Sequence, residues 1–391
     1  MKPFVPTSTT FLLVLGVLGA PSCSSSPAAA GFQAYERGDD QAALDAWQEL
    51  AMTGDETGQF MLALHLEEGR GVARDLEQAA RWYRAAAEQG HAPSQTNLGL
   101  MLASGQGVEA DLQEAVHWFK QAHEQDFAAA TTNLGLLQLL GQDLAVEPRQ
   151  GLVLLEEAAD EGDAQAANLI AAAHRIGFEV PVDHIAAARW YRRAADQGVA
   201  GAQYQLGLMH HQGEGLGKDD RKARRWLEQA VDQRLPEAQF LLARLEDQGL
   251  GGAEDVERAT RLLIAAAEQD FAQAQSELGL RFLHGEKVPR DERRAFSWMS
   301  RAAGNGLASA QYNLALMYIN GQGVEADRAA ALEWLGKAAA QGLAPAQDRL
   351  QALEAMATAA SLPEAEGDGF LEPTPRPRAV PVLLDDERRG G

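Results

Sequence analysis

The sequence is poor in cysteine and in aromatic residues. Cys23 is the single cysteine among 391 residues, so no disulfide can form within the chain and a cysteine-rich metal site is excluded. Aromatic residues make up 6% of the chain and apolar residues 46%. The apolar content is therefore mostly Ala and Leu, which favour tightly packed helices over sheets. We expect an all-α chain.

Basic residues are also few. The chain has 34 Lys+Arg against 56 Asp+Glu, which gives a formal net charge of -22. Recognition of phosphate groups needs a basic patch, and no Lys/Arg cluster in the sequence is long enough to supply one. The charge balance argues against a nucleic-acid partner, and it disfavours an anionic partner surface for the same reason.

The first 22 residues have the composition of an export signal. Lys2 precedes an apolar run, Phe11 to Ala20, which at about ten residues is too short to span a bilayer. The segment resembles a bacterial lipoprotein signal, in which a cysteine (here Cys23) is diacylated and becomes the mature N-terminus. The resemblance implies a lipid anchor; simple cleavage near Ala28 to Ala30 and no export are the alternatives. Because Ser24 replaces the Asp that retains such proteins at the inner membrane, we expect a periplasm-facing outer-membrane lipoprotein, or otherwise a periplasmic or secreted protein.

The middle of the chain repeats with a constant period of 36 residues. Eight rows, here called repeats 1 to 8, align without gaps and begin at Gly58, Ser94, Ala130, Ala166, Ala202, Ala238, Ala274 and Ala310. In every repeat the fifth residue is aliphatic, the sixth is Gly or Ala and the twelfth is Gly. The eighteenth is Asp except at Glu147, and six of the seven Trp residues share the twenty-fifth position. Four residues after that position every repeat has Ala.

Each of these recurring positions, here called columns, has a structural role. Apolar or small residues at Gln59, Leu62, Ala63 and Leu66 share one stripe of a helix. The Gly column ends that helix, because a left-handed C-cap is easily adopted only by Gly. The acidic column caps a second helix. Trp supplies a large apolar plug beside a close contact at Ala, so the two helices pack antiparallel.

Such helix pairs bury a continuous core only by stacking, which makes a solenoid. The segments Ser94 to Asp126 and Ala310 to Gly342 resemble the Sel-one-like repeat, a relative of the tetratricopeptide repeat. The resemblance implies a right-handed α-solenoid of antiparallel helix pairs. Repeats 3 and 4 depart most, because Pro148 follows Glu147 and the loop Gly177 to Asp183 lacks a second Gly.

Six segments follow from this reading. They are a signal peptide (1–22), a flexible tether (23–30), an N-terminal tetratricopeptide-like helix pair (31–57), eight repeats (58–345), a capping helix (346–361) and a disordered, proline-rich tail (362–391).

No motif in the sequence indicates a catalytic site. The GxG loops, such as Gly69/Gly71, lie between helices rather than after a strand, so they are turns rather than phosphate cradles. His174 and His210 share one column and are interpreted as buried histidines rather than zinc ligands, since no carboxylate pair stands at ligand spacing. The pair Glu67-Glu68 is interpreted as a charged helix end. We therefore expect no enzyme activity, metal or cofactor.

The resemblance implies adaptor work in the cell envelope, with a protein or peptide partner. The alternative is an envelope-structural role in which the acidic solenoid binds peptidoglycan or another glycan; a hydrolase is a third, weaker reading. The sequence does not indicate an oligomeric state.

Helix geometry predicts where a partner would bind. At about 100° per residue, positions three, seven and ten of each repeat cluster away from the core stripe and would line a concave groove. In the central repeats the variable residues at these positions combine aromatic rings with Arg, the composition of a binding hot spot. The predicted partner-binding residues are Asn168, Arg175, Tyr204, His211, Phe240, Arg244 and Asp247.

Overall fold

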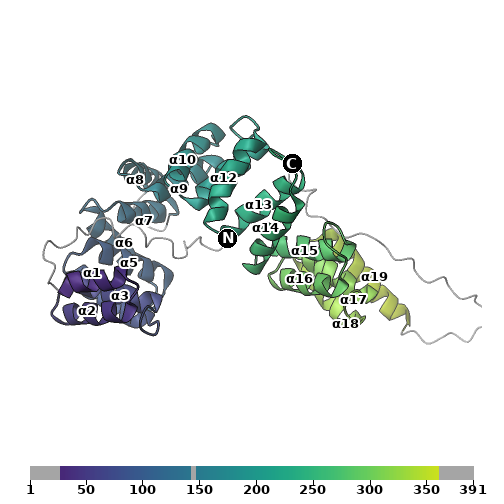
Figure 1. Ribbon diagram of the computed structural model, residues 1–391, viewed down its shortest axis with the longest axis horizontal. Coiled ribbons are helices and arrows are strands. Elements are labelled where there is room, and N and C mark those ends of the chain that lie inside the picture. Colours follow the sequence, from purple (N-terminus) through teal and green to yellow (C-terminus); the bar gives the residue numbers. More distant parts are fainter. Residues whose placement is uncertain (1–26, 142–146, 361–391) are drawn as a thin grey trace, which may run out of the picture. The chain divides into compact units, whose positions relative to one another are not determined.

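The computed structural model describes residues 27–141 and 147–360, and this part of the chain is built from α-helices without strands (Figure 1). The predicted signal peptide, Cys23 and the proline-rich tail lie outside the described residues. The helices are α1 (Pro27–Glu36), α2 (Asp40–Met52), α3 (Glu56–Glu68), α4 (Leu76–Glu88), α5 (Ala92–Ser104), α6 (Leu112–His123), α7 (Ala128–Leu139), α8 (Pro148–Asp160), α9 (Ala164–Ile176), α10 (His184–Asp196), α11 (Ala200–Gln212), α12 (Asp220–Asp232), α13 (Pro236–Asp247), α14 (Val256–Glu268), α15 (Ala272–His284), α16 (Glu292–Gly304), α17 (Ala308–Asn320), α18 (Arg328–Ala340) and α19 (Ala344–Ala360).

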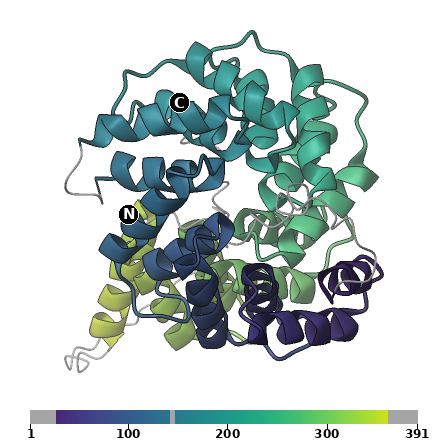
Figure 2. The same cartoon turned by 90° about the vertical axis from the view of Figure 1, so that its left-hand side faces the viewer.

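The helices are grouped into two compact units. Unit 1 holds α1 to α10 and ends at Val199, and unit 2 begins at Ala200 and holds α11 to α19. From α1 to α18, each odd-numbered helix packs against the next helix, and within each unit each such hairpin packs against the hairpin that follows it (Figure 2). The predicted all-α solenoid of helix pairs is thereby confirmed.

The helix ends form as the columns predict. Gly69, Gly105, Gly177, Gly285 and Gly321 are left-handed C-caps with φ between 66° and 73°. The acidic column caps the second helix of seven repeats through its side chain, as where Asp75 accepts the backbone N–H of Gln78 at 2.9 Å. Glu147 makes no such side-chain bond; the Gln150 N–H instead donates to the Glu147 backbone carbonyl at 2.9 Å, and Pro148 fits the first turn of α8.

The prediction that the Trp column supplies the apolar plug of each hairpin is wrong. The residue after that column supplies it. These residues are at most 3% exposed: Tyr83, Phe119, Leu155, Tyr191, Leu227, Leu263, Met299 and Leu335. Their side chains occupy the space beside the sixth position, where a Cβ on Gly99 would lie 2.6 Å from the Phe119 ring and one on Gly207 2.7 Å from Leu227. The plug therefore explains why that column accepts only Gly or Ala. Most of the Trp rings are only partly buried, and some stack with a basic side chain. Lys337 Nζ, for example, lies 4.0 Å from the centroid of the Trp334 ring.

Gln59 and its equivalents are buried polar residues rather than apolar members of the stripe. Gln59 is 6% exposed, and its Oε1 accepts a hydrogen bond from Gln89 Nε2 at 2.8 Å. The same bond, spanning 30 residues, recurs in five further repeats. It ties the first helix of a repeat to the loop after its second helix, so the polar column has a structural role.

Loops also join successive repeats. Two residues after the Gly column, Gly71, Gly107, Gly251 and Gly323 adopt positive φ, and an added Cβ would collide with a backbone carbonyl at the start of the second helix of the preceding helix pair. Repeats 4 and 7 place Glu179 and Lys287 at this position, with φ of 58° and 63°. The loop of repeat 4 thus keeps its backbone conformation without the second Gly, and the Glu179 carbonyl accepts from Arg149 Nε at 3.2 Å.

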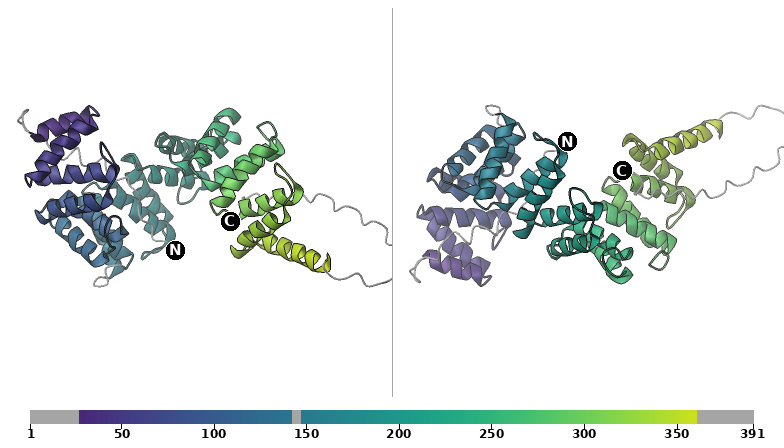
Figure 3. Two further views of the ribbon diagram at one scale, coloured as in Figure 1. Left: turned by 90° about the horizontal axis from the view of Figure 1, so that it is seen from below. Right: turned by 90° about the horizontal axis from the view of Figure 1, so that it is seen from above.

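Two end elements differ in extent from the sequence reading. Helix α1 begins at Pro27, so the end of the expected tether, up to residue 30, is already helical. Trp47 of α2 is fully buried and packs edge-on against Phe32 with ring centroids 4.8 Å apart. Helix α19 spans Ala344–Ala360 and packs against α18 at the end of unit 2 (Figure 3). Helices outside the repeats thus pack against both the first and the last repeat.

Replacement of His91 by Asn is expected to make the free energy of unfolding less dependent on pH in the acid range. His91 caps α5, and its Nδ1 accepts the Ser94 backbone N–H at 3.3 Å, so this nitrogen is unprotonated. Burial lowers the pKa of His91 to about 4 from 6.5. The unfolded chain therefore binds this proton more readily, so the stability that neutral His91 contributes is complete above pH 6.5 and is lost as the pH falls through 4, by roughly 3 kcal/mol in all. Asn is a good N-cap and does not titrate.

Urea unfolding of both proteins, at pH values above, within and below this window, measures the effect. Other groups of the chain titrate equally in both proteins, so the difference between the two pH profiles isolates His91. Parallel profiles would show that His91 does not carry the acid sensitivity.

Candidate partner-binding site

The seven predicted partner-binding residues are divided between the two units. Asn168 and Arg175 lie on α9 in unit 1; both are half-buried, and Arg175 takes part in an interaction within the fold. Tyr204, His211, Phe240, Arg244 and Asp247 lie on α11 and α13 in unit 2. The largest group can thus be described within unit 2 alone.

The two aromatic residues of this group are partly used by the core. Tyr204 and Phe240 are half-buried and pack against the core of unit 2. The Phe240 ring lies 5.4 Å from that of Phe271, and the Arg244 guanidinium carbon lies 5.8 Å from the Phe240 ring centroid. Phe240 and Arg244 therefore form a stacked pair on the partly exposed side of α13, which keeps the guanidinium oriented.

His211 is engaged with a neighbouring helix. Its Nδ1 lies 2.6 Å from Asp220 Oδ1, at the start of α12 in the same repeat. Both side chains are mostly buried, with 27% and 15% exposed. This contact joins the two helices of repeat 5, so His211 is held in the hairpin rather than presented to a partner.

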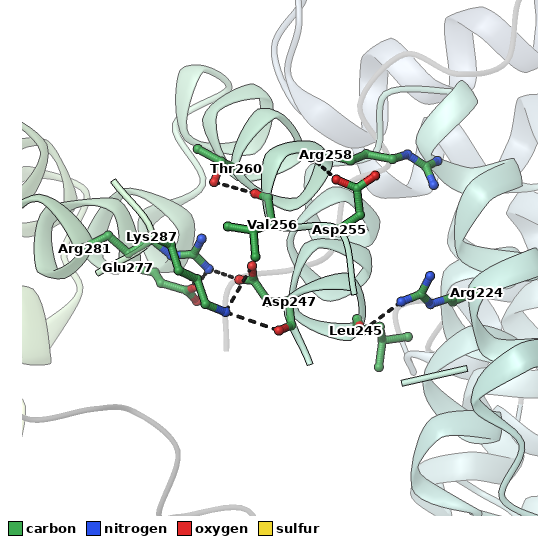
Figure 4. Close-up of polar contacts among 10 residues, drawn as sticks. All are labelled: Arg224, Leu245, Asp247, Asp255, Val256, Arg258, Thr260, Glu277, Arg281 and Lys287. Carbon is green, nitrogen blue, oxygen red and sulfur yellow. Dashed lines mark hydrogen bonds and ion pairs between the residues drawn. The ribbon is translucent and has the colours of Figure 1, made fainter. Parts of the chain in front are cut away.

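The prediction placed Asp247 in the groove, but the structure buries it. Its side chain is 5% exposed and forms an ion pair with Arg281 of α15, which is 7% exposed (Figure 4). Lys287 in the next loop lies 3.2 Å from Asp247 Oδ1, and Arg281 also pairs with Glu277. Because two buried charges are stable in the interior only when paired, Asp247 serves the contact between repeats 6 and 7.

Glu246, the residue before it, is also buried, against the second helix of its own repeat. Its side chain is 1% exposed, and Oε1 lies 2.5 Å from Arg258 of α14. Burial raises the pKa of Glu246, and the Arg258 and Arg224 guanidinium groups oppose that rise. Arg224 itself donates to the carbonyl of Leu245 (Figure 4) and to those of Leu250 and Ala253, and so holds the loop after α13. Both acids at the end of α13 therefore hold neighbouring elements together.

What remains partly exposed on the first helices of repeats 5 to 7 is a row of alternating apolar and polar side chains. Positions four and seven of each repeat are three residues apart, so they share one helix face. We call this surface the unit 2 groove face; its half-buried residues are Gln205, Leu208, Leu241, Arg244, Glu277 and Leu280. The ion pair between α13 and α15, and the direct contacts of α11 with α13, place these helices side by side.

Sequence reasoning found Arg244 on this face but missed position four. The signal was available for Arg281, because it is the one Arg at a position where five of the other seven repeats have Met or Leu. No pattern within one repeat indicated that its partner is Asp247, 34 residues earlier. The pairing is set by the stacking of two repeats.

The described residues hold no arrangement for catalysis or metal binding that resembles a known constellation. No cluster of three or more His, Cys, Asp or Glu side chains in residues 27–141 and 147–360 is placed to hold a metal ion. Nor does this part of the chain contain a helix of the length and hydropathy that crossing a membrane requires. The face described above can make contacts with another molecule through apolar and charged side chains.

Comparisons with known proteins agree with this architecture. The Sel1 repeat family model matches eight consecutive segments, 57–91, 92–127, 128–163, 164–199, 200–235, 236–271, 272–307 and 308–343. A Sel1 repeat protein from Oxalobacter formigenes is 30% identical, with a TM-score of 0.58, over 85% of this chain and 94% of that one. A protective antigen of uropathogenic Escherichia coli strains with an SLR fold is 28% identical, with a TM-score of 0.52, over 84% and 79% of the two chains. No curated protein is significantly similar to the sequence.

Sel1 repeat proteins are generally scaffolds for protein interactions. The matched segments cover most of the chain and follow one another without a break from residue 57 to residue 343. Each matched segment begins within one residue of the first helix of a helix pair. The chain belongs to the Sel1 repeat family.

Proposed function

We propose that this protein is a non-enzymatic adaptor of the bacterial cell envelope that binds a polypeptide segment on the unit 2 groove face. The observation that supports the proposal is the alternation of half-buried Leu208, Leu241 and Leu280 with Gln205, Arg244 and Glu277 on adjacent helices. Apolar contacts give a bound segment its affinity, and the polar groups between them fix its register.

The proposed partner segment is amphipathic and carries a carboxylate opposite Arg244. The stack of Arg244 on Phe240 restricts the guanidinium before binding, so less conformational entropy is lost when it meets a carboxylate. Tyr204 remains a flanking contact. Asp247 and His211 are left out, because both are engaged inside the fold.

The proposed location in the envelope is supported by the sequence before α1. The segment ending at Cys23 resembles a lipoprotein signal, and α1 begins four residues after this cysteine. We propose that Cys23 carries the lipid and that the repeats lie close to the membrane surface. Replacement of Cys23 by Ala is the direct test, because it removes the acceptor of the lipid; retention of the variant in the membrane fraction would contradict the anchor.

A photo-crosslinking amino acid at Leu208 is expected to capture a polypeptide in native envelope extract, whereas the same group at Glu257, exposed on α14, is not. With the captured partner purified, Arg244→Ala should weaken binding at least about five-fold, since it removes a hot-spot guanidinium. The matched control is Arg261→Ala, which removes an exposed Arg paired with Glu257 on α14.

Calorimetric titration and thermal melting of each variant distinguish binding from stability. Equal affinities of Arg244→Ala and the original protein, with unchanged melting temperatures, would contradict the groove assignment. Sedimentation of the original protein with murein sacculi, in the absence of any captured polypeptide, would contradict the adaptor function.

A further inference from the structure

Exposed large apolar side chains of the described residues are concentrated in one part of unit 1. Six of the seven belong to repeats 3 and 4: Leu140, Val153, Ile176, Phe178, Val182 and Ile185. The last four surround the loop between α9 and α10 and are exposed by 64%, 38%, 55% and 56%. We call these four residues the α9–α10 tip.

The four side chains are neighbours. Ile176 and Phe178 flank the C-cap Gly177, and a Cβ on Gly177 would lie 2.7 Å from Val182 Cγ2. Ile185 follows Val182 by three residues, in the first turn of α10. The four exposed apolar residues therefore surround one loop rather than being scattered over the unit.

The other repeats show that the fold does not require apolar residues here. Repeat 8 has the same loop backbone, with Asn320, Gln322, Ala326 and Ala329 at the four equivalent positions. Repeat 5 has Gln212, Glu214, Lys218 and Arg221. Repeats 5 and 8 form the same helix pair with polar or small residues at these positions. The hairpin of repeat 4 therefore does not require apolar side chains there.

The tip is also held firmly in place. Gly177 has φ of 73°, and the Phe178 amide donates to the Ala173 carbonyl at 3.0 Å. The Asp183 side chain caps α10 by accepting two backbone N–H bonds, and its own backbone N–H donates to the His174 carbonyl at 2.9 Å. The apolar side chains are thus presented by an ordered turn.

The size and chemistry of the tip indicate its occupant. A stable interface between two copies of the chain needs about 800 Å² from each partner, which is more than four half-exposed side chains supply. Protein hot spots are enriched in Trp, Tyr and Arg, and three of the four tip residues are Ile or Val. An apolar turn at the end of a helix pair needs no complementary pocket when it enters the interfacial layer of a bilayer.

We propose that the α9–α10 tip inserts into a lipid surface and so orients unit 1 on the membrane. This inference rests on the proposed envelope location, where a lipid on Cys23 supplies the first attachment and the tip the second, as stable membrane binding requires. Because the chain carries a net charge of -22, apolar burial and not attraction to anionic headgroups drives the insertion.

The test uses the chain from Ser24 onward with an N-terminal histidine tag in place of Cys23, and all vesicles contain a nickel-chelating lipid that binds the tag and so supplies the first attachment. This chain retains every described residue and contains no cysteine. Val182→Cys introduces a single thiol for the environment-sensitive fluorophore NBD, and Ala326→Cys is the matched label at the equivalent position of repeat 8. Addition of phosphatidylcholine vesicles should shift NBD emission to the blue at residue 182 and not at residue 326. The shift should not increase when phosphatidylglycerol replaces part of the phosphatidylcholine.

Transplanting the repeat 8 residues, Ile176→Asn, Phe178→Gln and Ile185→Ala, into the Val182→Cys protein should abolish the shift. Circular dichroism melting of this variant verifies that the fold is kept. No shift at residue 182 in the folded protein, or a concentration-dependent shift without vesicles, would overturn the inference, the latter by showing self-association. Membrane fractionation of Cys23→Ala tests the anchor separately, so the two attachments fail or hold independently.

Discussion

Replacement of Asp247 by Ala is expected to lower the free energy of unfolding by about 3 to 5 kcal/mol. The substitution leaves Arg281, with 7% of its side chain exposed, without one of its two carboxylate partners. A buried guanidinium that loses its counter-charge keeps the cost of desolvation and loses the compensating attraction. Urea unfolding measures the loss, and hydrogen exchange locates it, since the amides of α13 and α15 should lose the most protection.

A paired substitution tests the same idea in the opposite direction. Asp247→Leu together with Arg281→Met installs residues that other repeats have at these positions, Leu283 and Met101 among them. Because hydrophobic replacement of a whole buried ion pair is often neutral or stabilising, the double variant should recover most of the stability lost in Asp247→Ala. A double variant as unstable as the single one would show that the charge pair is not what the site requires.

Replacement of Gly251 by Ala is expected to cost more than about 3 kcal/mol, through two separate causes. Gly251 has φ of 75°, which is unfavourable for any residue with a Cβ. The added Cβ would also overlap the Asp220 carbonyl at the start of α12, which is backbone and cannot rotate away. The loop of repeat 6 must then separate from repeat 5.

Gly306→Ala is the matched control for this prediction. Gly306 has φ of 88°, and an added Cβ would meet nothing within 4 Å. It therefore measures the backbone strain alone, about 1 to 2 kcal/mol. Thermal and urea unfolding of both variants separate strain from collision. Equal losses in the two variants would show that the contact between the loop and the preceding repeat contributes nothing.

Much of the fold was predictable because the determinants are local and recur. The Gly column and the Asp column lie within one repeat, and their roles as caps follow from backbone conformation and the helix dipole. The close contact at Ala, as at Ala266, is likewise confirmed, with 0% exposure. Repetition supplied eight independent views of the same pattern, which made the helix boundaries clear.

The plug and the polar column were misread for a physical reason. Trp82 and Tyr83 are adjacent in sequence, and helix periodicity alone does not decide which of two large neighbours points into the hairpin. Gln59 has the spacing of a core residue and is buried, but its amide reaches Gln89 in the following loop. Burial therefore followed from the pattern, while the hydrogen-bond partner did not.

At the candidate site, too, some features follow from the sequence of one repeat and others only from the stacking of repeats. Position within the repeat placed Arg244 on a partly exposed face, and the sequence alone also determined the all-α class, the repeat length and the two caps of each hairpin. The tertiary structure decided that Asp247 is buried against Arg281. Residues of different repeats meet only when the hairpins stack, and the free energy of burying a charge depends on which neighbour that stacking brings within hydrogen-bonding distance.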